Sequence, residues 1–102
     1  MYGTVARMQI RPGAEPQLMA LSEAYAATTV PGYVGAYLYR MDNEPNTYFM
    51  AVIFESREAY HANASTPTQD RLYHQMLSGL EEPPVWHDGE IVSHRTASDA
   101  AR

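Results

Sequence analysis

The two adjacent segments 33–41 and 47–55 constrain the fold most, because as β-strands neither would have a polar face. Side chains alternate across a strand, so each segment presents two sets of residues. In the first segment the sets are Tyr33, Tyr37, Tyr39 and Met41 against Val34, Ala36 and Leu38. In the second they are Tyr48, Met50, Val52 and Phe54 against Phe49, Ala51 and Ile53. A hairpin covered on one side alternates apolar with polar residues, so this hairpin requires cover on both faces.

A chain of 102 residues is long enough for one domain, with helices for only one face of such a sheet. Its composition, 45% hydrophobic and 19% charged residues, is typical of a globular protein and not of a disordered one. The simplest source of the missing cover is a second copy of the same chain. The sequence thus predicts a homodimer.

The charge balance limits the partners that we expect. Seven arginines, no lysine and twelve acidic residues give a net charge of −5 at pH 7, which argues against nucleic acid or an anionic membrane as a partner. There is no cysteine, and the histidines show no metal-ligand spacing, so we expect no metal site. There is also no signal-peptide pattern and no apolar run near 18 residues, which predicts a cytoplasmic protein.

The order of the expected elements indicates the fold class. A strand over 2–10 precedes a helix that opens at Glu15 and Pro16 and stops before Gly32. After the hairpin, Ser56 is a natural N-cap for a second helix, which breaks at 65–67 and restarts over 68–80. A last strand covers 85–93. This βαββαβ order predicts an α+β, ferredoxin-like fold: a four-stranded antiparallel sheet with the helices on one face. We expect one domain over 1–94 and a flexible tail over 95–102.

Several short motifs resemble a known family. They are Arg-Pro-Gly at 11–13, Pro-Gly-Tyr-Val-Gly at 31–35, Phe-Glu-Ser-Arg-Glu-Ala-Tyr at 54–60 and Trp-His-Asp-Gly-Glu-Ile at 86–91. Over residues 2–93 the chain resembles the antibiotic biosynthesis monooxygenase superfamily. The resemblance implies a dimeric α/β barrel, in which two sheets pack face to face. The superfamily includes cofactor-free oxygenases of aromatic polyketides, haem-degrading oxygenases and isomerases, so the fold leaves the activity open.

The resemblance also implies candidate site residues. The quinone-forming branch uses an Asn, a Trp and a Tyr at relative positions 0, +4 and +10, and here Asn63 and Tyr73 match while Pro67 replaces the Trp. The haem-degrading branch uses a His late in the second helix, an Asn on the first strand and a Trp. Here His74 corresponds to the His, the first strand contains no Asn, and Trp86 lies in another segment.

The residues themselves allow two interpretations at most of these positions. Asn63 is predicted either to bind a substrate oxygen or to cap the helix break. The helical period places Tyr73 inward and His74 at the rim, where a histidine is suited to carry a proton. Aromatic side chains and Met are expected to bind the substrate or to fill an ordinary core; the predicted substrate-binding residues are Tyr25, Tyr37, Phe54, Met76 and Trp86.

Arg40 lies among apolar residues on the second strand. It is expected to pair with Glu55 or Glu90 across the sheet or the dimer seam, or to bind a ligand anion.

The leading functional hypothesis is a homodimeric, cofactor-independent monooxygenase that acts on an aromatic or polyketide-like small molecule, with catalytic roles for Asn63, Tyr73 and His74. It requires no metal, flavin or haem, and the sequence has no glycine-rich phosphate loop of the kind that nucleotide cofactors use. The alternative is a non-enzymatic dimeric barrel that binds ligands or responds to stress. Haem binding or degradation is the third hypothesis and has the fewest matching residues.

Overall fold

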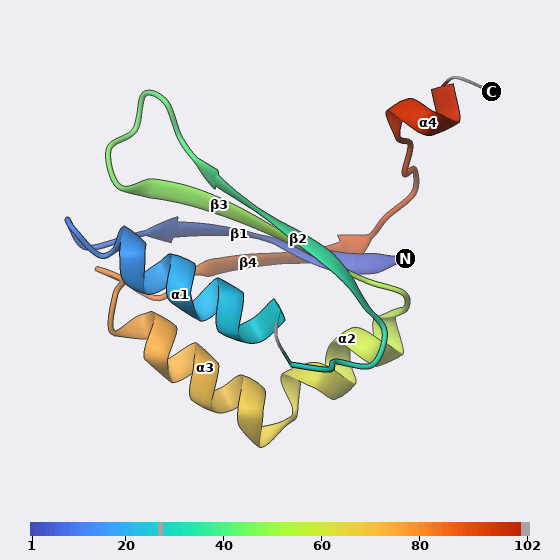
Figure 1. Cartoon of the computed structure of the whole chain (residues 1–102), viewed down its shortest axis with the longest axis horizontal. Helices are drawn as coiled ribbons and strands as arrows, with labels where there is room; N and C mark the ends of the chain where they lie inside the picture. The colour runs from blue at the N-terminus through green and yellow to red at the C-terminus, as the bar shows by residue number, and fades with distance from the viewer. Residues whose placement is uncertain (27, 101–102) are drawn as a thin grey trace.

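The computed structural model describes residues 1–26 and 28–100. Its elements are β1 (Tyr2–Gln9), α1 (Glu15–Ala26), β2 (Tyr33–Arg40), β3 (Thr47–Phe54), α2 (Arg57–Ala64), α3 (Pro67–Leu77), β4 (Val85–Glu90) and α4 (Ala97–Ala100). The strands form one antiparallel sheet in the order β2-β3-β1-β4 (Figure 1). This arrangement confirms the predicted α+β, ferredoxin-like fold with a four-stranded sheet.

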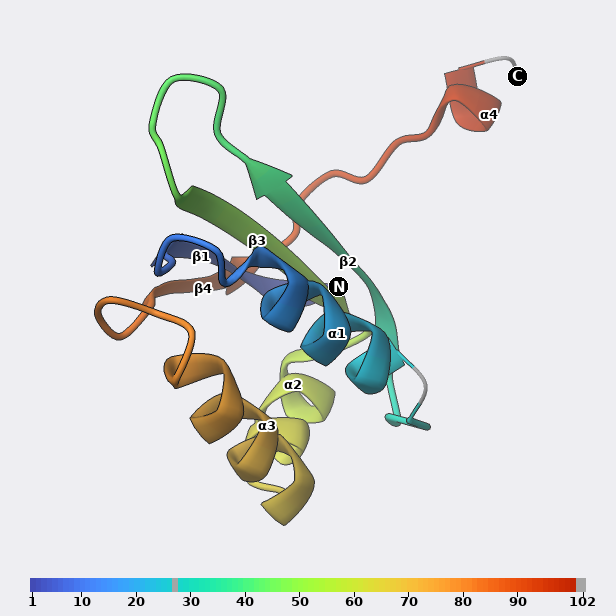
Figure 2. The same ribbon diagram turned by 60° about the vertical axis from the view of Figure 1, so that its left-hand side comes forward.

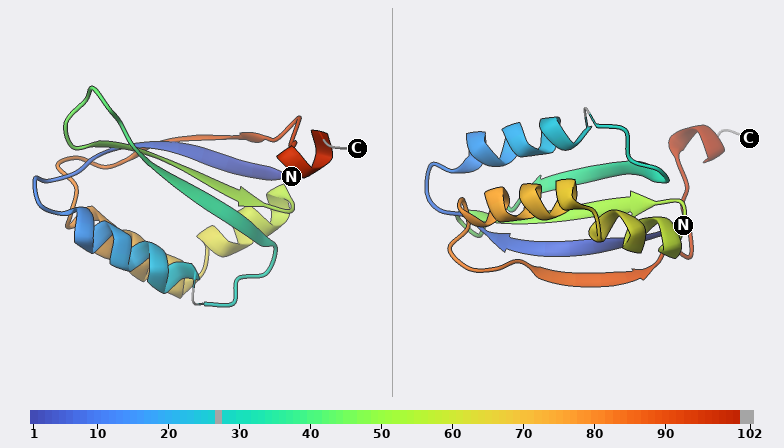
Figure 3. Two further views of the ribbon diagram at one scale, coloured as in Figure 1. Left: turned by 45° about the horizontal axis from the view of Figure 1, so that its top comes forward. Right: turned by 90° about the horizontal axis from the view of Figure 1, so that it is seen from below.

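Helices α1, α2 and α3 cover one face of the sheet and leave the other open (Figure 3). On the covered face of the central strands, Ala6, Met8 and Phe54 are at most 1% exposed. Helices α1 and α3 lie side by side (Figure 2), where the Gln17 Nε2 donates to the Ser78 Oγ at 2.7 Å. The core is therefore a single layer between the sheet and its helices.

Local chemistry explains why the second helical region is split. Ser56 caps α2, because its Oγ accepts from the backbone N–H of Ala59 at 3.1 Å. At the break, the Thr66 Oγ1 accepts from the Gln69 N–H, and Pro67 occupies the first turn of α3. The predicted cap and the predicted break are both confirmed, and α3 begins one residue earlier than expected.

Tyr33 lies on a different face from the one its spacing predicted. Strand β2 pairs with β3 through an irregularity, so that Tyr33 is opposite Phe54 while Gly35 is opposite Ile53. The extra residue shifts the alternation. Tyr33 therefore points to the helices, whereas Tyr37 stays on the open face, and the expectation that they share a face is wrong.

The partner of Arg40 also differs from the prediction. Its guanidinium forms an ion pair with Glu15 at the start of α1, and its Nε donates to the Tyr48 Oη at 3.3 Å. Arg40 lies opposite Tyr48 on the covered face, where the first turn of α1 is closer than either expected glutamate. The hydrogen bond from Arg40, aided by one from Tyr48, lowers the pKa of Glu15 below its ordinary value.

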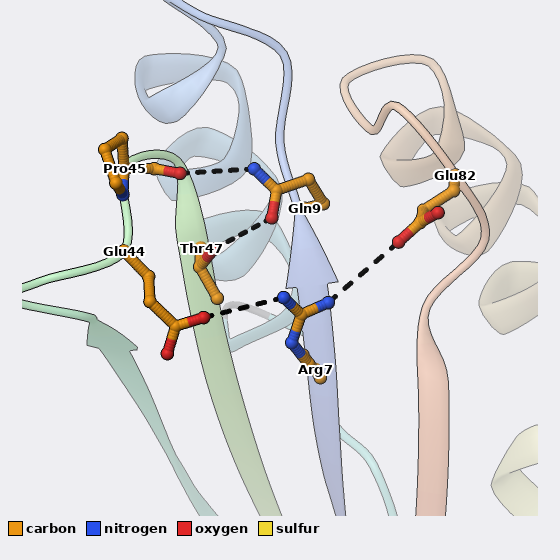
Figure 4. A network of polar contacts seen from close by, with 6 residues as sticks. All are labelled: Arg7, Gln9, Glu44, Pro45, Thr47 and Glu82. Atoms are coloured by element: carbon orange, nitrogen blue, oxygen red, sulfur yellow. Dashed lines mark hydrogen bonds and ion pairs between the residues drawn. The ribbon is translucent and has the colours of Figure 1, made fainter.

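The open face has an apolar centre and a polar end. Its apolar side chains include Val5, Tyr37, Tyr39 and Val85, which are 46%, 60%, 50% and 50% exposed. At the polar end, Arg7 lies between Glu44 at 3.6 Å and Glu82 at 4.0 Å (Figure 4). Beside it, the Thr47 Oγ1 donates to the Gln9 Oε1 at 2.8 Å, and the Gln9 Nε2 donates to the Pro45 carbonyl at 3.2 Å.

The chain leaves the sheet after Glu90, three residues earlier than predicted, and runs away from the body of the fold to the short helix α4 (Figures 1 and 2). The expected flexibility of the tail remains a prediction, and Ala101 and Arg102 lie outside the described residues. Among the helices of the described ranges, none has the length and apolar content of a membrane span.

Candidate active site

A cavity of about 540 Å³ lies between the covered face of the sheet and the three helices. This volume is within the range of small-molecule sites, roughly 300–1,000 Å³. All four strands and helices α1, α2 and α3 contribute side chains to its wall. Most of these side chains are apolar or aromatic, and the polar groups gather in two clusters on either side of α2.

The first polar cluster joins α1 to α2. The Asn63 Nδ2 donates to the Tyr25 Oη at 3.1 Å, and both residues line the cavity. Burial raises the pKa of Tyr25 to about 12; the electrostatic effect of Tyr33 adds to this, and the hydrogen bond from Asn63 acts in the opposite direction. Tyr25 is therefore a neutral hydroxyl at physiological pH, and its own hydrogen is available to a ligand oxygen.

The side chain of Asn63 does not cap the helix break. Its backbone carbonyl accepts from the Thr66 N–H at 3.0 Å and from the Thr66 Oγ1 at 2.8 Å, so Thr66 makes the polar contacts of the turn. The Asn63 amide lies in the cavity wall, where it donates to Tyr25. Its predicted role in binding a substrate oxygen stays a prediction.

The second polar cluster joins α2 to the edge strand β4. The Tyr60 Oη donates to the Asp88 Oδ1 at 2.8 Å. Burial and the bond to Asp88 raise the pKa of Tyr60 to about 12, while the neighbouring Thr4 hydroxyl acts in the opposite direction. The oxygens of Thr4 and Tyr60 do not meet the geometry of a hydrogen bond, and Thr4 Oγ1, on a residue only 4% exposed, has no partner among the described residues.

A chain of aromatic rings runs between the two clusters. Tyr25 contacts Tyr33 edge-on with ring centroids 5.1 Å apart, Tyr33 contacts Phe54 at 5.7 Å, and Phe54 contacts Tyr60 at 5.7 Å. All four rings line the cavity. Edge-to-face packing of this kind stabilises each pair and leaves ring faces for a flat ligand.

Helix α3 and strand β4 close a third side with aromatic side chains. Tyr73 lines the cavity, and its ring lies 6.3 Å from that of Trp86, which is the one tryptophan of the sequence. Met76 lies on the same helix face as Tyr73 and lines the cavity too. Trp86 thus adds an aromatic side chain to the cavity from β4.

The cavity brings together most of the residues that the sequence singled out, namely Tyr25, Phe54, Asn63, Tyr73, Met76 and Trp86. Tyr37 is not one of its lining residues, because it lies on the open face of the sheet. His74 is outside the wall as well: its side chain is 66% exposed, and its Nε2 lies 3.4 Å from the Asp70 Oδ1. The other histidines of the described residues do not line the cavity either.

Sequence reasoning missed Thr4, Tyr60, Gln69 and Asp88, which all line the cavity. Thr4 could have been recognised from the sequence, because it is the one polar residue in the alternating series with Tyr2, Ala6 and Met8. Tyr60 and Asp88 had no such signal, because their partnership spans 28 residues and two elements. Within the described residues there is no cluster of three side chains suited to hold a metal ion.

A family model described as antibiotic biosynthesis monooxygenase matches residues 1–74 of the chain. No similar sequence was found among curated proteins.

Solved structures show the same fold. A Caulobacter crescentus protein whose name assigns it to the antibiotic biosynthesis monooxygenases superposes on this chain with a TM-score of 0.79. The identity is 20%, and the match covers 90% of each chain. Rv0793 from Mycobacterium tuberculosis gives a TM-score of 0.73 at 20% identity, covering 93% of this chain and 98% of the other. SnoaB from Streptomyces nogalater, a cofactor-independent oxygenase solved in a mutant form, gives 0.69 at 15% identity, covering 94% and 95%.

Proposed function

The chain belongs to the antibiotic biosynthesis monooxygenase family, and from that premise we propose that it is a cofactor-independent monooxygenase of an aromatic or polyketide-like small molecule. The cavity with its Asn63–Tyr25 hydrogen bond carries the proposal, because it combines an aromatic wall with donors for a substrate oxygen. SnoaB, which shares the fold, is described as a cofactor-independent oxygenase.

The proposed reaction needs no group beyond the substrate, dioxygen and a base. The base removes a proton from an electron-rich phenol that carries a CH₂ group, and the resulting anion passes electrons to dioxygen. A C–O bond then forms at that carbon, and the hydroperoxide loses water to leave a carbonyl. One oxygen atom ends in the product and the other in water, so the substrate supplies both electrons that reduce the second atom.

The side chains at the Asn63 end are suited to the step in which the substrate oxygen gains charge. Tyr25 has a free O–H hydrogen and is aligned by the bond from Asn63. Tyr73 lines the cavity from α3 on the side of Trp86, and we propose that its hydroxyl is a second donor to the substrate. Fixed donors aimed at a developing oxyanion lower the barrier because they need no reorganisation during the reaction.

We also propose that the protein works as a homodimer through the open face of the sheet. Val5, Tyr37 and Tyr39 are 46%, 60% and 50% exposed, and apolar patches of this kind are typical of interfaces. A second sheet packed on this face would cover them and would leave the cavity of each subunit intact.

Turnover of an anthrone-type phenol in air, without added cofactor, tests the function. Loss of one preorganised donor typically costs on the order of 10²–10³ in turnover. The turnover of the Asn63→Ala and Tyr73→Phe variants is therefore expected to fall by about that factor, while their melting temperatures stay nearly unchanged. Ser65→Ala is the matched control, since Ser65 is exposed on the same turn and its Oγ donates to the His61 carbonyl. If both variants turn over normally per folded molecule, Asn63 and Tyr73 are structural residues and the cavity proposal in this form is wrong. A wild type without turnover would favour the ligand-binding barrel instead.

The proton acceptor is a separate part of the proposal. His74, the histidine named from the sequence, lies at the rim beside Tyr73, with ring centroids 5.9 Å apart. General-base catalysis contributes typically 10²–10⁴-fold, so His74→Ala is expected to lower turnover by at least about 10²-fold if His74 carries the proton. An unchanged rate in this variant would remove His74 from the mechanism without affecting the roles of Asn63 and Tyr73.

A further inference from the structure

The two polar clusters of the cavity present opposite hydrogen-bonding character. At the first, the Asn63 Nδ2 occupies an acceptor site of the Tyr25 oxygen, so the Tyr25 hydrogen is left to donate. At the second, the Tyr60 hydrogen is committed to Asp88, so the remaining capacity of Tyr60 and Asp88 is to accept. The cavity therefore offers a hydrogen-bond donor at one end and hydrogen-bond acceptors at the other.

Two further oxygens of the cavity wall are buried and have no hydrogen-bond partner among the described residues. Thr4 Oγ1 is buried beside Tyr60 without a hydrogen bond, and so is the Gln69 Oε1 on α3; neither has a partner within the described residues. Both residues line the cavity. Buried polar atoms are normally paired, and an unpaired one is costly. A ligand group that donates a hydrogen bond here would relieve that cost.

The charge of the wall narrows the ligand class. Asp70 and Asp88 line the cavity, and no arginine of the described chain does. A carboxylate or phosphate on the ligand would meet acceptors and negative charge at this end, which disfavours it. A neutral hydroxyl would meet the Tyr60 oxygen, the Asp88 carboxylate and the Thr4 hydroxyl with matching polarity.

Both ends of the cavity are held by α2. Asn63 of the first cluster and Tyr60 of the second are three residues apart on this helix, which makes them neighbours on its surface. The rings of Tyr33 and Phe54 lie in the series of contacts that joins Tyr25 to Tyr60. A flat ligand that lies against these rings would contact both ends at once.

We propose that Thr4, Tyr60 and Asp88 form a second binding subsite, which takes a hydroxyl of the substrate while Tyr25 donates to a carbonyl or phenolate oxygen at the other end. The substrate class is thus a neutral, planar aromatic compound with an oxygen acceptor at one end and a hydroxyl donor at the other. The inference rests on the proposed function, since it specifies the ligand of the same cavity.

Equilibrium binding of three matched ketones tests the subsite: 5-hydroxy-1-tetralone, 5-methoxy-1-tetralone and 1-tetralone. Quenching of Trp86 fluorescence reports occupancy, because Trp86 lines the cavity and is the chain's one tryptophan. The hydroxy ketone is expected to bind about tenfold more tightly than the methoxy ketone, as one satisfied hydrogen bond predicts. The double variant Tyr60→Phe with Asp88→Leu is expected to reduce this preference to less than about threefold.

The matched control is Tyr2→Phe with Glu90→Leu. These residues also pair across β1 and β4, but they do not line the cavity, so the tenfold preference is expected to persist. If the first double variant unfolds, Thr4→Val, which is nearly isosteric, is expected to reduce the preference on its own.

The outcomes of this experiment separate the subsite from the proposed function. Equal affinity of the wild type for the hydroxy and methoxy ketones, or an undiminished preference after loss of Tyr60 and Asp88 or of the Thr4 hydroxyl, overturns the subsite and leaves the proposed function standing. Failure of all three ketones to quench Trp86 in the wild type overturns both.

Discussion

The two faces of the sheet are built by alternate residues of the same strands, yet they differ sharply in exposure. On β1, Ala6 is fully buried under the helices, whereas its neighbour Val5 is 46% exposed on the other face. On the first of these faces the chain completes its own core and encloses a cavity. On the second it leaves an apolar surface that no segment of the described chain covers. Under the proposed function, binding and assembly therefore lie on opposite faces of one sheet.

The largest effect is expected from a charge on the open face. Ile53→Glu would place a carboxylate in the centre of the proposed interface, and by symmetry two of them in each dimer. The effective cost is several kcal/mol for each buried ion, so association is expected to weaken by at least roughly 10⁴-fold. Light scattering at micromolar concentration would show the wild type at twice the 11.4 kDa of one chain and the variant at one.

Met19→Glu is the control for that substitution, since Met19 is 45% exposed on α1, away from the open face. It is expected to leave the dimer intact. A folded wild-type monomer in the same measurement would contradict the assembly and the interpretation of the open face with it.

A pair of substitutions on one strand sharpens the comparison. Phe54 is 1% exposed and packs against Tyr33 and Tyr60 on the covered face, while Phe49 lies half-buried on the open face. Phe54→Ala is expected to lower the free energy of unfolding by about 3–5 kcal/mol, equally at every protein concentration. Phe49→Ala is expected to act through assembly, so its cost is concentration-dependent.

Urea unfolding of both variants at two protein concentrations, a hundredfold apart, measures this difference. The same shift for Phe49→Ala at both concentrations would mean that its ring stabilises only the subunit. The open face would then contribute nothing to an interface at that position.

The parts of the fold that the sequence predicted depend on local chemistry. Ser56 caps a helix through a contact three residues away, and the turn with Thr66 and Pro67 breaks the next helix through equally short contacts. The alternation of β3 likewise predicted its two faces. The doubly apolar hairpin indicated an uncovered face, which the structure contains.

The parts that the sequence could not predict depend on long-range geometry. The irregularity near Gly35 turned Tyr33 to the covered face. A glycine inside a strand can mark such a bulge, but it does not determine which neighbouring side chain changes face. Arg40 pairs with Glu15, 25 residues away in the sequence, because α1 starts over the end of β2. The pairing of Tyr60 with Asp88 depends on which edge strand faces α2, which only the completed sheet decides.

The smallest effect is expected from alkaline pH, and it acts on the covered face. The folded pKa of Tyr25 and that of Tyr60 are raised to about 12 from an ordinary value of 10.0, chiefly by burial. A raised pKa means that folding favours the neutral phenol, so this contribution is fully present below pH 10 and is lost as the pH rises towards 12. Stability is therefore expected to decline over this interval.

Urea unfolding at pH 9 and pH 11 measures the decline, and the double variant Tyr25→Phe with Tyr60→Phe is expected to reduce it. An equal decline in this double variant would show that the covered tyrosines ionise without opposing the fold, and that the loss arises elsewhere.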